Sequence, residues 1–116
     1  MQQSKVLSMI GLAQRAGKVA SGEFSTEKAV KSGHASVVFV AGDSSDNTKK
    51  MFTNMCTFYN VPIYIYSDKE TLGHAIGKQF RASLAVLDNG FRDAIVKNMQ
   101  AENKEIHTDE DTKEQQ

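Results

Sequence analysis

The strongest constraint on the fold is an apolar run at positions 36–41, SVVFVA, which is rich in β-branched and aromatic side chains. Such side chains favour β-strands, and a strand without alternating polar residues is typical of a sheet that is buried on both faces. A sheet of this kind needs helices packed above and below it. Segments with helical periodicity flank the run and alternate with other short strand candidates.

Helical periodicity and turn residues predict helices and strands in alternating order. We expect the helices at residues 4–16, 23–32, 48–59, 69–76 and 88–100, and the strands at residues 18–21, 36–41, 62–66 and 83–87. This order predicts an α/β protein, a three-layer α/β/α sandwich around a central sheet of about four mixed strands. A chain of 116 residues is short for two independent cores, so we expect a single domain over residues 1–101.

The charge distribution separates this domain from the C-terminal segment. Residues 102–116 carry six acidic and two basic side chains, whereas residues 1–101 carry twelve basic and eight acidic ones. The segment 102–116 is also poor in large apolar residues, so we expect an acidic tail that is disordered or loosely helical. A basic body favours an anionic partner, although acidic tails also simply improve solubility.

Composition excludes several classes of protein. The single cysteine, Cys56, excludes internal disulfides and a CxxC zinc site. No apolar run approaches the roughly 20 residues that span a bilayer, and the N-terminus lacks the apolar stretch of a signal peptide. We therefore expect a cytoplasmic protein without membrane contact.

No arrangement in the sequence is typical of catalysis. His34 and His74 lack the spacing of metal ligands, and Cys56 falls on the apolar stripe of its helix, where a small buried residue is expected. Asp43 and Asp46 lie ahead of a helix, as capping residues do. We therefore expect no enzyme, no catalytic residues, no metal and no cofactor.

Two basic clusters favour binding instead. The first surrounds the turn between the first strand and the second helix, where free N–H groups and a glycine suit a phosphate, and its cations are Arg15, Lys18, Lys28 and Lys31. The second lies in the loop before the last strand and consists of Lys78, Gln79, Phe80 and Arg81. An exposed ring between cations can stack on an unpaired base while the cations hold its phosphates. The alternatives are a solvated basic helix face for the first cluster and a buried Phe80 for the second.

A series of motifs follows the chain in a specific order. It comprises Ser21-Gly22, Lys28-Ala29-Val30, Gly33, VVFVAGD at 37–43, NTKK at 47–50, Cys56, Val61-Pro62, LGHAIGK at 72–78 and SLAV at 83–86. Over about residues 4–100, this series resembles the ribosomal L7Ae and L30e superfamily and, within it, the bacterial YlxQ branch. The resemblance implies an α/β/α sandwich that binds kink-turn RNA, as family members do in ribosomes, small ribonucleoproteins and regulatory RNAs.

The resemblance can be transferred only residue by residue. In the family, the second helix begins with Gly, any residue, Asn, Glu, two further residues and Lys. Gly22 and Lys28 match this pattern, whereas Phe24 replaces the Asn and Ser25 replaces the Glu. The family's Asn and Glu read tandem G·A pairs, and the loss of a base contact costs about 1–3 kcal/mol. We therefore expect phosphate attraction to survive while specificity for the standard kink-turn weakens.

The resemblance implies a non-catalytic protein that recognises structured, kink-turn-like RNA, with ribosomal RNA and the ribosome among the candidate partners. In this interpretation Gly22 (through its backbone N–H), Ser25 and Lys28 engage the stem, and the loop with Phe80 holds the bulged strand. Arg15, Lys18 and Lys31 supply phosphate attraction, and a monomer is favoured. The alternative is a protein-interaction adaptor of the Gadd45-like type that uses the Phe24 surface. A third interpretation is a free relative of the substrate-binding domain of some RNA methyltransferases.

Overall fold

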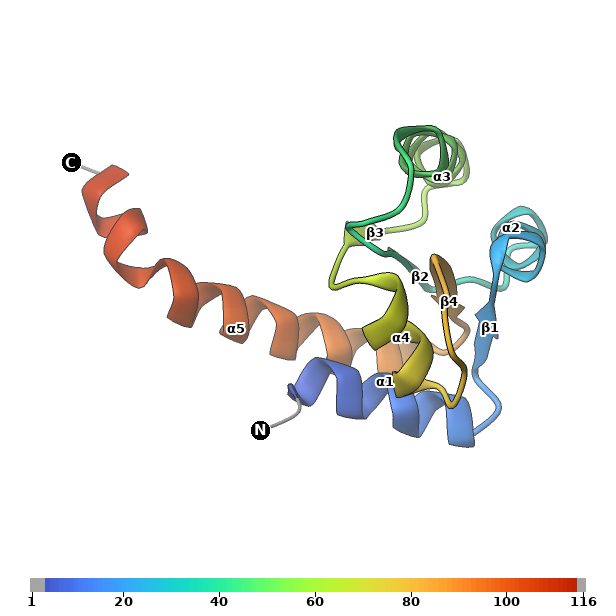
Figure 1. Cartoon of the computed structure of the whole chain (residues 1–116), viewed down its shortest axis with the longest axis horizontal. Coiled ribbons are helices and arrows are strands. Elements are labelled where there is room, and N and C mark those ends of the chain that lie inside the picture. The colour runs from blue at the N-terminus through green and yellow to red at the C-terminus, as the bar shows by residue number, and fades with distance from the viewer. Residues whose placement is uncertain (1–3, 115–116) are drawn as a thin grey trace.

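The computed structural model describes the backbone of residues 4–114 and the side chains of residues 4–102. Its elements follow the predicted order: α1 (Lys5–Arg15), β1 (Val19–Ser21), α2 (Glu23–Lys31), β2 (Val37–Val40), α3 (Asp46–Tyr59), β3 (Ile63–Ile65), α4 (Lys69–Ala75), β4 (Ser83–Val86) and α5 (Asn89–Glu114). The α/β/α sandwich is confirmed, with α2 and α3 on one face of the sheet and α1, α4 and α5 on the other (Figure 1).

The last helix is longer than the sequence predicts. It continues to Glu114 instead of ending at Gln100, and its C-terminal half projects beyond the body of the molecule (Figure 1). Residues 101–114 contain no Gly or Pro, and Glu and Lys, which are good helix formers, make up six of these fourteen residues, so nothing in their local chemistry interrupts the helix. The division of the chain after residue 101 and the disorder of segment 102–116 stay predictions.

The sheet is mixed, as expected, and its strand order is β1-β4-β2-β3. The strands β2 and β3 are parallel, with Val38 opposite Ile63, whereas β4 runs antiparallel to both β2 and β1. Consequently the C-terminal ends of β1, β2 and β3 and the N-terminal end of β4 all lie at the same end of the sheet. Loops that are distant in the sequence therefore meet at this end.

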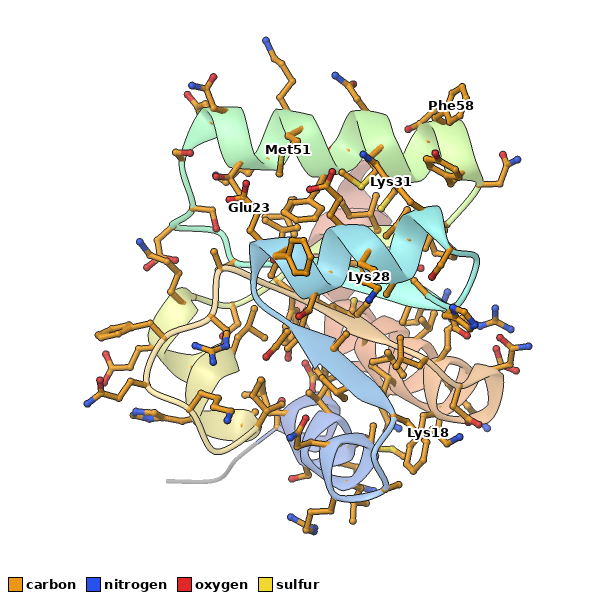
Figure 2. The ribbon with its side chains drawn as sticks, turned by 90° about the vertical axis from the view of Figure 1, so that its right-hand side faces the viewer. Lys18, Glu23, Lys28, Lys31, Met51 and Phe58 are labelled. Atoms are coloured by element: carbon orange, nitrogen blue, oxygen red, sulfur yellow. The ribbon has the colours of Figure 1, made fainter. Side chains whose placement is uncertain are left out.

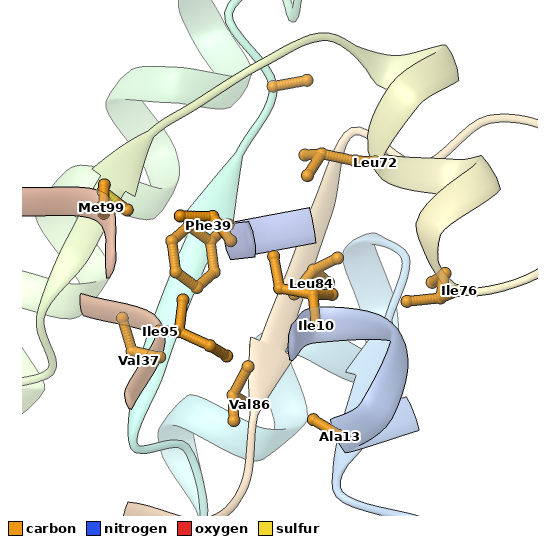
Figure 3. Packing of buried hydrophobic residues seen from close by; sticks show 12 residues of the cluster. Ile10, Ala13, Val37, Phe39, Leu72, Ile76, Leu84, Val86, Ile95 and Met99 are labelled. Carbon is orange, nitrogen blue, oxygen red and sulfur yellow. The ribbon is translucent and has the colours of Figure 1, made fainter. Parts of the chain in front are cut away.

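The core has two layers because the side chains of β2 alternate between the two faces of the sheet. Val37 and Phe39 contact the layer formed by α1, α4 and α5, where Ile10, Leu72 and Ile95 are fully buried (Figure 3). The intervening residues of β2 belong to the second layer with α2 and α3, whose buried residues include Ala29, Val30, Phe52 and Cys56. All of β2 is buried, which confirms the interpretation of the apolar run at 36–41.

Short polar side chains define where the helices near this end of the sheet begin. Ser45 caps α3 by accepting a hydrogen bond from the Thr48 N–H, and Asp68 caps α4 by accepting one from the Thr71 N–H. Asp43 also caps α4, since its Oδ1 accepts from the Lys69 N–H at 2.9 Å. The loop after β2 is thereby joined to the start of α4. Within the described part of the chain, no helix is both long and apolar enough to cross a membrane.

Candidate nucleic-acid interface

The two predicted basic segments meet where β1 ends and β4 begins. The Gly22 N–H donates to the Ser83 carbonyl oxygen at 2.9 Å, and Arg81 Nε donates to Ser21 Oγ at 3.1 Å. Beneath them, the buried hydroxyls of Thr26 and Ser83 are 3.4 Å apart. The turn before α2 and the loop 77–82 therefore form one continuous surface, although 60 residues separate Ser21 from Arg81.

The N-terminus of α2 presents free backbone donors, but Gly22 is not one of them. The N–H of Gly22 donates to the Ser83 carbonyl oxygen, so it is not free for a phosphate, and contact of Gly22 with RNA stays a prediction. Gly22 instead adopts φ +90°, a conformation that favours glycine, and caps α2 without a side-chain hydrogen bond. No hydrogen bond is found for the N–H groups of Glu23, Phe24 and Ser25 within the described residues, as expected for the first turn of a helix.

The loop 77–82 is held against α4 by its backbone. The Lys78 N–H donates to the Gly73 carbonyl at 2.8 Å, and the Arg81 N–H donates to the Lys69 carbonyl at 3.0 Å. Arg81 Nη1 also donates to the Phe80 carbonyl at 2.7 Å. The side chains of Lys78, Gln79 and Phe80 are exposed, and 59% of Phe80 is accessible to solvent. The alternative of a buried Phe80 is therefore wrong.

The cations of the first cluster do not all surround the turn. Lys28 is exposed on α2, and Lys31 lies one turn further along, where its Nζ donates to Glu27 Oε2 at 2.7 Å. This hydrogen bond and the charge of Glu27 raise the pKa of Lys31. Lys18 lies at the opposite end of β1 from α2 (Figure 2), and Arg15 lines a groove between α1 and α4 beside His74. The predicted cluster is therefore only partly formed, and contact of Arg15 and Lys18 with RNA stays a prediction.

Two surface grooves lie beside this interface. The first, of about 390 Å³, lies along α2 and is lined by Phe24, Glu27, Lys28, Lys31 and Ser32. The second, of about 780 Å³, lies beside Phe80 and is mostly acidic, with Asp43, Asp68, Lys69, Glu70 and Thr71. The sequence analysis identified neither groove. The second groove joins residues from three separate segments, which no local pattern brings together. The helical spacing of Phe24, Lys28 and Lys31 is the signal that could have indicated the first.

Cys56 and the histidines with described side chains, His34 and His74, differ in their exposure to solvent. Cys56 is buried, and burial raises the pKa of its thiol to about 11, which keeps it protonated at neutral pH. His34 and His74 are exposed, with His34 Nδ1 lying 2.7 Å from Ser32 Oγ. Within residues whose side chains are described, no group of three or more His, Cys, Asp or Glu side chains is arranged to hold a metal ion.

The chain is similar to known proteins in its sequence and in its fold. The chain is 39% identical over 88 residues to the RNA-binding protein YlxQ of Bacillus subtilis (strain 168), an overlap of 76% of this chain and 88% of that protein. It is 30% identical over 95 residues to the large ribosomal subunit protein eL30 of Tetrahymena thermophila, an overlap of 80% and 91%.

Two solved structures have folds similar to that of this chain. A protein with unknown function from Bacillus halodurans C superposes with a TM-score of 0.81 at 34% identity, over 84% of this chain and 99% of the other. The Giardia lamblia 15.5kD RNA binding protein has the same fold, with a TM-score of 0.70 at 16% identity over 87% and 90%. The model of the ribosomal protein L7Ae/L30e/S12e/Gadd45 family matches residues 4–96. The chain therefore belongs to the ribosomal protein L7Ae/L30e/S12e/Gadd45 family.

Proposed function

We propose that this chain is a non-catalytic RNA-binding protein that recognises structured RNA of the kink-turn type, with ribosomal or regulatory RNA as its target. Relatives called RNA-binding protein YlxQ and a ribosomal subunit protein support this class of ligand. The observation that carries the proposal is the contact between Arg81 and Ser21, which joins the start of α2 to the loop 77–82. One ligand can therefore contact both segments at once.

The chemistry of each segment suits a different part of an RNA. The free N–H groups of the first turn of α2, the Ser25 hydroxyl and the Lys28 ammonium attract phosphate oxygens. Arg81 uses two of its donors within the protein, and a guanidinium has five, so the others stay available for a phosphate. The exposed ring of Phe80 can stack on an unpaired base. The acidic groove beyond Phe80 repels phosphates, which favours an approach of the RNA backbone from the α2 side.

Titration of a kink-turn stem beside a matched straight duplex, each at two salt concentrations, tests the proposal. We expect tighter binding of the kinked RNA and a steep loss of affinity with salt. Lys28→Ala and Arg81→Ala should each weaken binding, and each lost phosphate contact should reduce the salt slope by about 0.7–0.9. The unfolding midpoint of each variant shows whether the fold is intact, since Arg81 also bonds Ser21.

Lys97→Ala provides the matched control for these variants. Lys97 is exposed on α5 and lines a groove with Pro62, at the opposite end of the sheet from Arg81. The Lys97→Ala substitution removes one positive charge, as Lys28→Ala does. An equal loss of affinity in the two variants would therefore indicate general electrostatic attraction without a defined interface. Wild-type affinity in both Lys28→Ala and Arg81→Ala would contradict the proposed surface.

A protein-interaction adaptor of the Gadd45-like type is the second candidate. The observation that favours it is the exposure of large aromatic side chains, 78% for Phe24 and 77% for Phe58. Exposed aromatic residues commonly anchor protein interfaces. The same titration separates the two candidates, because an adaptor is expected to bind neither RNA at either salt concentration.

A further inference from the structure

The groove on α2 combines one bare aromatic ring with cations on a single helix face. Phe24, Lys28 and Lys31 follow one another at intervals of four and three residues, so they share one face of α2. The groove they line has a volume of about 390 Å³, within the range of small-ligand sites. This size and composition suit one flat, anionic group better than an extended chain.

The ring of Phe24 has no aromatic partner among the described residues. Phe39 stacks on Tyr64 and meets Tyr66 edge to face, and Phe58 contacts Tyr59 at a centroid distance of 4.9 Å, but Phe24 takes part in no such pair. With 78% of the residue exposed, the ring is open to a ligand. Phe58 has nearly the same exposure, yet Tyr59 already contacts it.

The two lysines of the groove differ in their partners. Lys31 is held by Glu27 at 2.7 Å, whereas the salt bridges found among the described residues do not include Lys28. The groove therefore offers one uncommitted cation, Lys28, one turn away from the ring. A nucleotide presents the complementary pair, a flat base and a single phosphate charge.

We propose that Phe24 and Lys28 form a subsite for one unpaired nucleotide, with the base stacked on the Phe24 ring and the adjoining phosphate bound by Lys28. This subsite rests on the proposed RNA-binding function and specifies how the α2 surface contributes to it. Phe24 lies in the first turn of α2, three residues after Ser21, which Arg81 bonds, and this proximity to the proposed RNA surface favours RNA over a protein as the occupant. Because every base has a π-face, the subsite selects an unpaired nucleotide without selecting its identity.

Three variants test the subsite on an RNA stem with an internal bulge of unpaired nucleotides. Phe24→Ala should weaken binding on the order of ten-fold, because base–aromatic stacking is lost. Phe24→Trp should retain or tighten binding. The chain contains no Trp, so this variant also provides a single fluorophore whose emission should be quenched when a base stacks on it. Phe58→Ala, which removes a ring of equal exposure outside the groove, should bind as the wild type does.

Abasic replacement of the bulged nucleotides, one at a time, identifies the stacked base. At one position the abasic RNA should weaken wild-type binding about as much as Phe24→Ala does, and the two changes together should cause no further loss. Phe80→Ala should show this pattern at a different position or at none.

The outcomes separate the subsite from the function on which it rests. If the wild type binds the RNA and Phe24→Ala binds equally well, the subsite is overturned while RNA binding stands, and a protein partner becomes the better occupant of the Phe24 surface. Additive losses at every abasic position, or an unquenched Phe24→Trp emission in the saturated complex, would also overturn it. Absence of RNA binding by the wild type would overturn the proposed function and the subsite together.

Discussion

Glu27 and Lys31 show how one acidic residue limits the charge of the α2 surface. Their side chains are 2.7 Å apart on the exposed face of α2. The hydrogen bond and the charge of Glu27 raise the pKa of Lys31, so Lys31 is protonated well above neutral pH. The ammonium is nevertheless shared with a carboxylate. Of the two lysines in the groove, Lys28 is the stronger attractor of phosphate.

Replacing Glu27 with Gln should therefore strengthen RNA binding. The substitution releases Lys31 and removes a negative charge from the groove, so we expect a higher affinity at low salt and a steeper salt slope, by up to about 0.9. Titration of a bulged RNA stem at several salt concentrations measures both quantities.

Asp93→Asn is the control for this variant. It also removes one negative charge and releases a cation, Arg92, which is held by Asp93 at 2.9 Å on α5. If Asp93→Asn tightens binding as much as Glu27→Gln does, the effect comes from net charge and not from the groove.

At the scale of the elements, Gly73 determines how closely the loop 77–82 approaches α4. A Cβ atom at this position would lie 2.7 Å from the Gln79 carbonyl oxygen and 2.8 Å from the Phe80 nitrogen. These are backbone atoms, which cannot rotate away as the end of a side chain can. Gly73 is therefore needed for the position of Phe80 and Arg81.

Gly73→Ala should displace the loop and weaken both stability and RNA binding. Forced overpacking of this kind costs about 1–3 kcal/mol in the free energy of unfolding, which denaturant titration measures. RNA affinity should fall as well, because Arg81 can no longer reach Ser21 in the same geometry.

Gly90→Ala is the matched helical control, since its Cβ would lie 3.1 Å from Asp88 Oδ2, which caps α5 by accepting from the Phe91 N–H, so any strain stays at the start of α5. It should leave RNA binding unchanged. Equal affinity of Gly73→Ala and the wild type would show that the loop position does not matter for the ligand.

At the scale of the whole molecule, α5 carries the acidic segment away from the candidate interface. Its C-terminal end projects on the side of the molecule opposite β1 and α2 (Figure 1). Tyr66 anchors the helix where it leaves the body, since the Tyr66 hydroxyl donates to Glu102 Oε1 at 3.1 Å and lies 3.2 Å from Ser4 Oγ. Residues 103–114 extend about 18 Å further as a helix.

Deletion of residues 103–116 should affect RNA binding only through long-range repulsion. The deletion keeps Glu102 and its hydrogen bond with Tyr66. We expect tighter binding of a straight duplex at about 0.01 M salt, where the Debye length is about 30 Å, and no change near 0.15 M, where it is about 8 Å. An equal gain in affinity at both salt concentrations would instead indicate that the segment folds over the basic surface and competes with RNA.

The local elements were predictable because they depend on short-range chemistry. The apolar run at 36–41 indicated a strand buried on both faces, and β2 is buried throughout. The helical stripe with Phe52 indicated that Cys56 is a core residue, and Cys56 is fully buried. The order of the motifs indicated the family, which the match over residues 4–96 confirms.

Features of the site that depend on distant partners were less predictable. Gly22 matched the family's pattern, but its N–H pairs with Ser83, a residue of another strand. Lys18 and Lys28 are close in the sequence, yet β1 separates them in space. The exposure of Phe80 follows from the backbone contacts of its loop with α4, which no local pattern shows.

The sequence by itself determined the order of the helices and strands and the two-layered core, because periodicity and turn residues act over a few positions. The ordered series of motifs indicated the family. Only the tertiary structure decided which functional groups are free. Pairing of β1 with β4 uses the Gly22 N–H and brings Arg81 to Ser21, while the helical face of α2 leaves Phe24 bare and Lys28 without an acidic partner among the described residues. The contacts of Gly22 and Arg81 join segments that lie 60 or more residues apart, and local patterns in a sequence carry no record of such contacts.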